Sequence, residues 1–129
     1  MLTKIDLSGF DFVSRSSIKE LLEAVELMPC MRALSLRNNR ITDDYETEVL
    51  SIFNNKSLVY VDLSQNLMKK LGAEIGKKLR DECNHIQWID LTQNDFDRDA
   101  ATVTLILNGL KKQRELIYVG LSAQESHID

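Results

Sequence analysis

The sequence predicts an α/β domain in which a short strand and a helix alternate along the chain. Apolar residues recur with one spacing in five segments, and between these segments the apolar period changes from 2 to about 3.6 residues. The chain has 129 residues, of which 43% are apolar and 28% charged, and this is the composition of one globular core. At this length about two thirds of the surface of the unfolded chain is buried on folding, so stability requires neither metals nor disulfides.

Five segments share apolar residues at their positions 1, 4 and 6, and each is expected to contain a strand. They begin near residues 2, 31, 58, 86 and 116, so the period is 27 to 30 residues. The matching apolar residues are Leu2, Ile5 and Leu7; Met31, Leu34 and Leu36; Leu58, Val61 and Leu63; Ile86, Ile89 and Leu91; and Leu116, Val119 and Leu121. Position 9 is occupied by Phe10, Asn39, Asn66, Asn94 and Gln124.

A helix is expected after each of the first four segments. The second helix begins near Thr42, and the fourth begins after Asp97 or Asp99. Acidic residues at the start of the second helix and lysines near the end of the fourth match the helix dipole. The apolar faces are, in chain order, Ile18, Leu21, Leu22 and Val25; Tyr45, Val49, Leu50 and Phe53; Leu71, Ile75 and Leu79; and Val103, Ile106, Leu107 and Leu110.

The three most regular segments read MRALSLRNNRI, LVYVDLSQNLM and IQWIDLTQNDF. They resemble the leucine-rich repeat, L-x-x-L-x-L-x-x-N-x-L, and the period with true helices is similar to its ribonuclease-inhibitor-like subtype. The resemblance implies an α/β leucine-rich repeat solenoid, a horseshoe segment of about four and a half repeats with a parallel sheet on its concave face and helices on its convex face. It also implies that Asn39, Asn66 and Asn94 satisfy backbone groups where the chain turns off each strand.

The repeats fill residues 1–129 as a single domain. Terminal units of a repeat array normally carry polar caps, and the first and last units of this sequence show none. We therefore expect unpaired backbone groups on both outer strands. A fragment of a longer array is the favoured explanation, and the alternative is that two copies join end to end.

Charge and hydropathy exclude several classes of partner. The formal net charge is -4, which argues against broad phosphate binding and therefore against nucleic acid as a partner. No apolar run is long enough to span a membrane, and the N-terminus lacks the apolar core of a signal peptide. The expected location is cytoplasmic.

No constellation typical of an enzyme is present, and no catalytic, cofactor-binding or metal-binding residue is assigned. His85 and His127 lie in no metal-ligand spacing. Cys30 and Cys83 are expected to be free, because two repeats separate them by at least about 10 Å. A catalytic pair of Cys83 and His85 is geometrically awkward, because residues i and i+2 at a helix end diverge. The five glycines form no phosphate-binding loop.

Alternate strand residues, at positions 3, 5 and 7, point away from the core and form columns across the sheet. These columns are Lys4, Ala33, Tyr60, Trp88 and Tyr118; Asp6, Ser35, Asp62, Asp90 and Gly120; and Ser8, Arg37, Ser64, Thr92 and Ser122. The three consecutive aromatic rings either stabilise the sheet by stacking or supply contact area for a partner. The candidate protein-binding residues are Tyr60, Asp62, Trp88, Asp90, Tyr118 and Arg37.

The predicted function is a non-catalytic scaffold that binds a protein or peptide on its concave face. Asp62 and Asp90 would favour a basic or amphipathic partner, whose Lys or Arg can rest on an aromatic ring. An end-to-end assembly module is the alternative function. A second candidate surface on the convex side is a basic cluster that favourable placement in the helix dipole also explains: Lys77, Lys78, Arg80, Lys111, Lys112 and Arg114.

Overall fold

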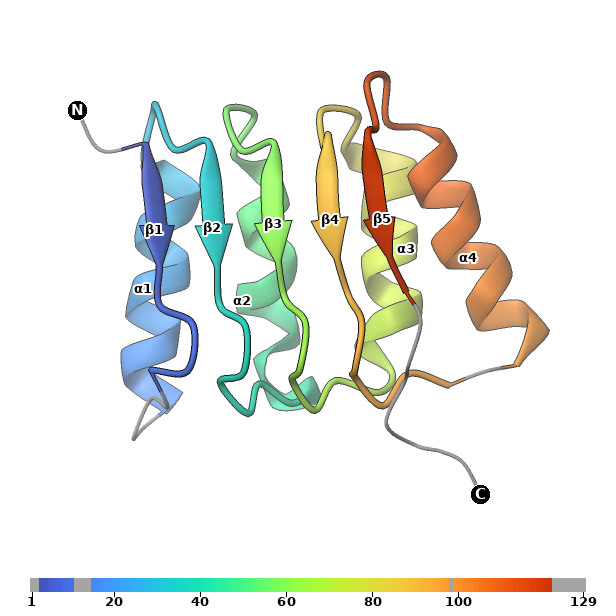
Figure 1. Ribbon diagram of the computed structural model, residues 1–129, viewed down its shortest axis with the longest axis horizontal. Helices are drawn as coiled ribbons and strands as arrows, with labels where there is room; N and C mark the ends of the chain where they lie inside the picture. Colours follow the sequence, from blue (N-terminus) through green and yellow to red (C-terminus); the bar gives the residue numbers. More distant parts are fainter. Residues whose placement is uncertain (1–2, 11–14, 98, 122–129) are drawn as a thin grey trace.

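The computed structural model describes residues 3–10, 15–97 and 99–121. The sequence predictions that concern Leu2, Ser122, Gln124 and His127 lie outside these residues. Within the described ranges, the chain alternates between short strands and helical segments, and Figure 1 shows one row of strands with the helices behind it.

Five parallel strands form one sheet in the order β1-β2-β3-β4-β5. They are β1 (Lys4–Asp6), β2 (Ala33–Ser35), β3 (Tyr60–Asp62), β4 (Trp88–Asp90) and β5 (Tyr118–Gly120). The register pairs equivalent repeat positions without a shift, so Tyr60 faces Trp88, and Trp88 faces Tyr118. Each strand therefore lies beside the strand of the next unit, as expected when consecutive units stack.

The helices cover one face of this sheet (Figure 1). They are α1 (Arg15–Leu27), α2 (Glu46–Ser51), α3 (Leu71–Glu82) and α4 (Ala100–Lys111). The second helical segment differs from the single helix expected from the sequence. It consists of a 3-10 turn η1 (Asp43–Tyr45), the short α2 and a second 3-10 turn η2 (Ile52–Asn54).

The core lies between the sheet and the helices. Leu34, Val61 and Ile89 come from the middle of three neighbouring strands and are fully buried. From the helical side, Leu22 and Ile75 are fully buried in the same cluster. Position 4 of each strand therefore points to the helices, while positions 3 and 5 point to the opposite face.

Buried asparagines hold the turns that follow the strands. Asn66 donates through Nδ2 to the carbonyls of Leu36, Leu63 and Ser64, and its Oδ1 accepts from the amides of Asn39 and Ile41. Asn39 and Asn94 donate to strand-end carbonyls in the same way; their partners are Leu7 and Arg37, and Leu63, Leu91 and Thr92. One amide thus joins two successive turns, because it offers both donors and an acceptor.

The residue before each of these turns has a left-handed backbone. Gly9, Asn38, Gln65 and Gln93 occupy the same repeat position and have φ values between 55° and 65°. Only Gly9 adopts this region without a steric cost, so the other three positions are strained. The recurrence of the strain in successive units indicates that the asparagine hydrogen bonds enforce it.

Other polar side chains satisfy the carbonyls at the opposite edge of the sheet, where each helical segment ends. Asn55 donates to the carbonyls of Val25 and Met28, each at 2.7 Å. Gln113 donates to the carbonyls of Leu79, Cys83 and Gly109. These carbonyls lie at or just after helix C-termini, where partners inside the helix run out. Asn55 thus caps the end of α1 and Gln113 caps the end of α3, each from the following unit.

The architecture corrects the fold class expected from the sequence. The described residues form a mixed α/β domain of five parallel strands, and a horseshoe solenoid segment is not supported. The physical reason is that horseshoe curvature accumulates from a small rotation at each unit of a long array. Of the helices in the described ranges, none combines the length and the apolar character needed to cross a membrane.

Candidate functional site

Three aromatic rings stack across the uncovered face of the sheet. The ring centroids of Tyr60 and Trp88 are 4.0 Å apart with planes inclined by 11°, and those of Trp88 and Tyr118 are 4.7 Å apart with planes inclined by 16°. These separations are close to the spacing of adjacent strands, about 4.8 Å, because the rings leave the backbone at paired positions. The register thus brings the three together as the repeat spacing predicts. We call Tyr60, Trp88 and Tyr118 the aromatic column.

The three residues of the aromatic column differ in their exposure to solvent. Tyr60 and Trp88 are half-buried, whereas Tyr118 at the end of the row is 42% exposed. Burial, followed by the nearby carboxylates of Asp62 and Asp90, raises the pKa of the Tyr60 hydroxyl above its ordinary value. Tyr60 therefore remains a neutral phenol at physiological pH and can both donate and accept a hydrogen bond.

The carboxylates beside the rings have a local role that the sequence analysis missed. Asp62 Oδ1 accepts from the amide of Ser64 at 2.9 Å and from its hydroxyl at 2.6 Å. Asp90 makes the same pair of bonds to Thr92 at 2.9 and 2.7 Å. The recurring Asp-x-Ser/Thr sequence was the available signal, because Asp side chains commonly close a turn on the amide two residues later.

These bonds leave part of each carboxylate available. Both bonds to Asp62 and both bonds to Asp90 use Oδ1, and Oδ2 accepts no hydrogen bond in the part of the chain that the structure describes. Asp62 is nevertheless only 7% exposed, so Asp90 is the better placed of the two to meet a partner. The two carboxylates lie beside the aromatic column, because Asp62 and Asp90 are paired two residues further along β3 and β4 than the rings.

Arg37 does not join the aromatic column. It lies two residues beyond the end of β2, in the row that contains Ser64 and Thr92. This row is four residues further along the strands than the aromatic residues, which corresponds to about 13 Å. Arg37 is exposed, so its side chain can add to a larger contact surface without touching the rings.

Cys83 and His85 do meet, contrary to the geometric argument from the sequence. Helix α3 ends at Glu82, and Cys83 has an extended backbone with φ -143° and ψ 133°. Residues i and i+2 of an extended segment point to the same side, so Cys83 Sγ lies 3.4 Å from His85 Nε2. The helix-end geometry assumed in the sequence analysis does not apply there.

This pair has the environment of a structural contact. Burial raises the pKa of the Cys83 thiol, and the side chain is only 5% exposed. The ring nitrogens of His85 lie 2.7 Å from the carbonyl of Leu58 and 3.2 Å from that of Phe53. A buried neutral thiol is a poor nucleophile, and His85 serves to hold backbone carbonyls. Cys30 and Cys83 are both free.

The described residues contain no group of three or more His, Cys, Asp or Glu side chains arranged to hold a metal ion.

The basic cluster on the helices is partly neutralised within α3. Lys77 pairs with Glu74 at 3.2 Å, Lys78 with Glu82 at 2.8 Å and Arg80 with Asp81 at 2.7 Å, and these pairs account for half of the cluster.

Of the comparisons with known proteins, only the comparison with solved structures finds matches. No protein-family model matches the chain, and no curated protein matches it. Among solved structures, leiomodin-1 actin-binding site 2 matches with a TM-score of 0.80 and 19% identity over 98% of this chain and 71% of that chain. The tropomodulin C-terminal domain of Caenorhabditis elegans matches with a TM-score of 0.78 and 17% identity over 94% of this chain and 74% of that chain.

The likeness establishes the fold. The chain adopts the mixed α/β fold of the leiomodin and tropomodulin domains, and this finding corrects the assignment to ribonuclease-inhibitor-like leucine-rich repeat proteins. The descriptions leucine-rich repeat and solenoid, which depended on that assignment, are therefore wrong as well. Apolar spacing specifies the local strand-turn-helix unit and its register, and it does not specify the family of domains in which such units are assembled.

Proposed function

We propose that this domain is a non-catalytic protein-binding module and that the uncovered face of the sheet, centred on the aromatic column, is its contact surface. The observation that carries the proposal is the stack of Tyr60, Trp88 and Tyr118 on that face. Parallel sheets are usually covered on both faces, and here the helices cover only one (Figure 1).

The chemistry of this face suits a partner with basic or amphipathic side chains. Stacked rings lose little conformational freedom on binding, and Trp and Tyr are enriched among residues that dominate binding energy. A Lys or Arg of the partner can lie against a ring, with the carboxylate of Asp90 close by to favour its charge. The carboxylate of Asp62 adds to the negative electrostatic potential of this face from a more buried position.

Actin is the first candidate partner. The solved structure of leiomodin-1 is named for an actin-binding site, and this chain shares its fold over nearly its whole length. The proposal is therefore that this domain binds actin through the aromatic column, supported by Asp90 and, at the periphery, by Arg37.

Binding is measured by co-sedimentation with actin filaments and by fluorescence anisotropy with monomeric actin. The wild-type domain is expected to bind at least one form. Trp88→Ala removes the central ring of the stack and is expected to weaken binding by about 2 kcal/mol, or roughly thirtyfold, if Trp88 dominates the contact. The triple alanine variant of Tyr60, Trp88 and Tyr118 is expected to abolish measurable binding.

Leu27→Ala is the matched control, because Leu27 is an apolar side chain that is 80% exposed and lies on α1 rather than on the sheet face. Its affinity for actin should equal that of the wild type. Retained binding in the triple alanine variant would exclude the sheet face as the contact surface. Absence of binding to both forms of actin would exclude actin as the partner.

End-to-end association is a second candidate function, favoured by apolar exposure at one end of the molecule. Ile117 is 78% exposed beside β5, and Val103 and Leu107 of α4 are each 45% exposed. β5 pairs only with β4 among the described strands, so its other edge offers backbone groups. Light scattering over a concentration series is expected to show growing mass if copies join there, and a constant monomer mass would refute this candidate.

A further inference from the structure

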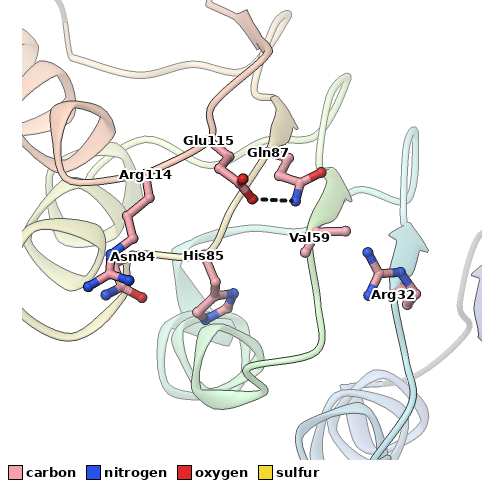
Figure 2. A pocket seen from close by; sticks show the side chains of 7 residues that line it. All are labelled: Arg32, Val59, Asn84, His85, Gln87, Arg114 and Glu115. Carbon is pink, nitrogen blue, oxygen red and sulfur yellow. Dashed lines mark hydrogen bonds between the residues drawn. The ribbon is translucent and has the colours of Figure 1, made fainter.

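A polar pocket of about 460 Å³ opens at the edge of the sheet where the chain enters the strands. Its lining comes from the segments before β2, β3, β4 and β5, and Figure 2 shows Arg32 and Arg114 on opposite sides of His85. The remaining lining residues are Val59, Asn84, Gln87 and Glu115. This pocket is separate from the aromatic column, which lies on the face of the sheet.

The two arginines are fixed through their backbones and have unused guanidinium groups. Arg32 donates its amide to the carbonyl of Thr3, and Arg114 donates its amide to the carbonyl of Asn84. Neither guanidinium makes an ion pair or hydrogen bond within residues 3–10, 15–97 and 99–121. Arg80 in α3 offers the contrast, because two hydrogen bonds of 2.7 and 2.8 Å tie its guanidinium to Asp81.

One carboxylate, that of Glu115, lines the pocket together with the two arginines. Glu115 accepts a hydrogen bond from Gln87 Nε2 at 3.4 Å, and Glu82 pairs with Lys78. The charged residues that line an adjoining pocket of about 350 Å³ are Lys56, Arg80, Asp81, Glu82 and Lys112, so basic side chains outnumber acidic ones in the two linings. Lys56 and Lys112 form no salt bridge in the described part of the chain. Positive charge thus gathers along this edge although the whole chain has a formal net charge of -4.

His85 shapes the pocket and leaves the binding chemistry to its neighbours. Its two ring nitrogens face the carbonyls of Leu58 and Phe53, at 2.7 and 3.2 Å. The ring is therefore pinned across the end of the second helical segment, where it forms a rigid wall. The donors that remain for a ligand are the two guanidinium groups and the amide of Asn84.

We propose that this pocket binds an acidic peptide segment, with carboxylates held by Arg32 and Arg114. A guanidinium matches a carboxylate through two parallel hydrogen bonds, and Asn84 can donate to a carboxylate or a peptide carbonyl. Both arginines are exposed, so the binding is modest in strength and sensitive to salt. A nucleic acid is disfavoured, because two guanidinium groups neutralise only about two phosphates, whereas the affinity of nucleic-acid binding depends on many such contacts.

The test is a fluorescence anisotropy titration of the domain against a fluorescein-labelled peptide of eight glutamates. Saturable binding is expected at about 50 mM salt, with a loss of about tenfold in affinity at about 300 mM salt. Replacing both arginines, Arg32→Glu with Arg114→Glu, is expected to weaken binding by about tenfold or more. If this variant fails to fold by circular dichroism, Arg32→Gln with Arg114→Gln replaces it, and a loss of several-fold is expected.

The matched control makes the same change of charge elsewhere. Lys69→Glu with Lys70→Glu alters two exposed lysines at the opposite edge of the sheet, just before α3, and is expected to change the affinity by less than about twofold. An equal loss in this control would reduce the effect to overall charge and overturn the proposal. The absence of saturable binding at low salt would overturn it, as would equal or tighter binding of a single-stranded DNA of the same charge.

Discussion

Buried side-chain amides are the residues on which the turns of this domain depend. Asn66 is 1% exposed and takes part in five hydrogen bonds with backbone groups of two successive turns. Without this side chain, buried carbonyls and amides would lose partners that water cannot replace. The strained backbone at Gln65, immediately before Asn66, would lose its restraint as well.

Asn66→Ala is therefore expected to lower the free energy of unfolding by about 3 kcal/mol. Asn54→Ala is the matched control, because Asn54 is exposed and donates only to the exposed carboxylate of Glu26. Its expected effect is below about 0.5 kcal/mol. Urea unfolding followed by circular dichroism measures both variants. Similar small losses in the two would mean that the turns close without the buried amide.

Asp62 and Asp90 each close a turn and also leave one carboxylate oxygen for other contacts. Each closes the turn at its strand end through Oδ1, and each keeps Oδ2 without a hydrogen bond in the described part of the chain. Gly120 stands beside Asp90 in the next strand, and a Cβ there would lie 2.5 Å from Asp90 Oδ1. The absence of a side chain at Gly120 thus gives the carboxylate its space next to the aromatic column.

At the scale of elements, the closest packing is between α3 and α4. A Cβ at Gly76 would lie 2.6 Å from the backbone carbon and oxygen of Leu105 in α4, and a Cβ at Gly109 would lie within contact distance of the Gly76 carbonyl. The two helices touch backbone to backbone at this point. Within the Gly72-x-x-x-Gly76 pattern, Gly76 therefore serves the packing of α3 on α4, whereas Gly72 lies against the side chain of Phe96.

Gly76→Ala is expected to destabilise the domain by about 2 kcal/mol, although Ala in a helix normally gains roughly 1 kcal/mol over Gly. The clash is with backbone, which cannot move without separating the helices. Gly72→Ala provides the graded comparison, because its Cβ would meet the side chain of Phe96 at 2.8 Å, and a side chain can shift. Thermal unfolding should show a clearly larger loss for Gly76→Ala, and an increase in stability at Gly76 would contradict the packing.

Element boundaries show where sequence reasoning succeeds and where it stops. Spacing predicts that Tyr60, Trp88 and Tyr118 share a column, because register follows from one repeated period. It does not predict that Asp43 accepts hydrogen bonds from the amides of Lys69, Lys70 and Leu71, where the chain enters α3. That contact joins residues 26 to 28 positions apart, so no local pattern contains it.

The candidate site follows the same division. The stacked rings were predictable from the sequence, whereas the contact of Cys83 with His85 depends on where α3 ends, and helix ends are poorly determined by periodicity. The pocket at the strand-entry edge was not predictable either, because Arg32 and Arg114 are 82 positions apart and come to line one pocket only through the stacking of several units. The assignment of the family failed because repeated spacing describes a unit rather than a whole domain.

At the scale of the whole molecule, the order of the strands sets the distribution of stability. Interior strands pair on both sides, whereas β1 and β5 each pair on one side among the described strands. The exposure of the apolar residues follows, since Val61 and Ile89 are fully buried while Ile5 and Val119 are only partly buried. Opening at either end therefore costs less free energy than opening in the middle.

Amide hydrogen exchange of the dilute domain tests this gradient with matched residue types at one repeat position. Val61 is expected to exchange at least about tenfold more slowly than Val119, and Ile89 more slowly than Ile5 by a similar factor. Equal protection across each pair would show that the domain opens only as one cooperative unit. Protection of Val119 and Ile5 that rises with protein concentration would instead place an interface on the outer strands, because a second copy would then cover the edges that these residues occupy.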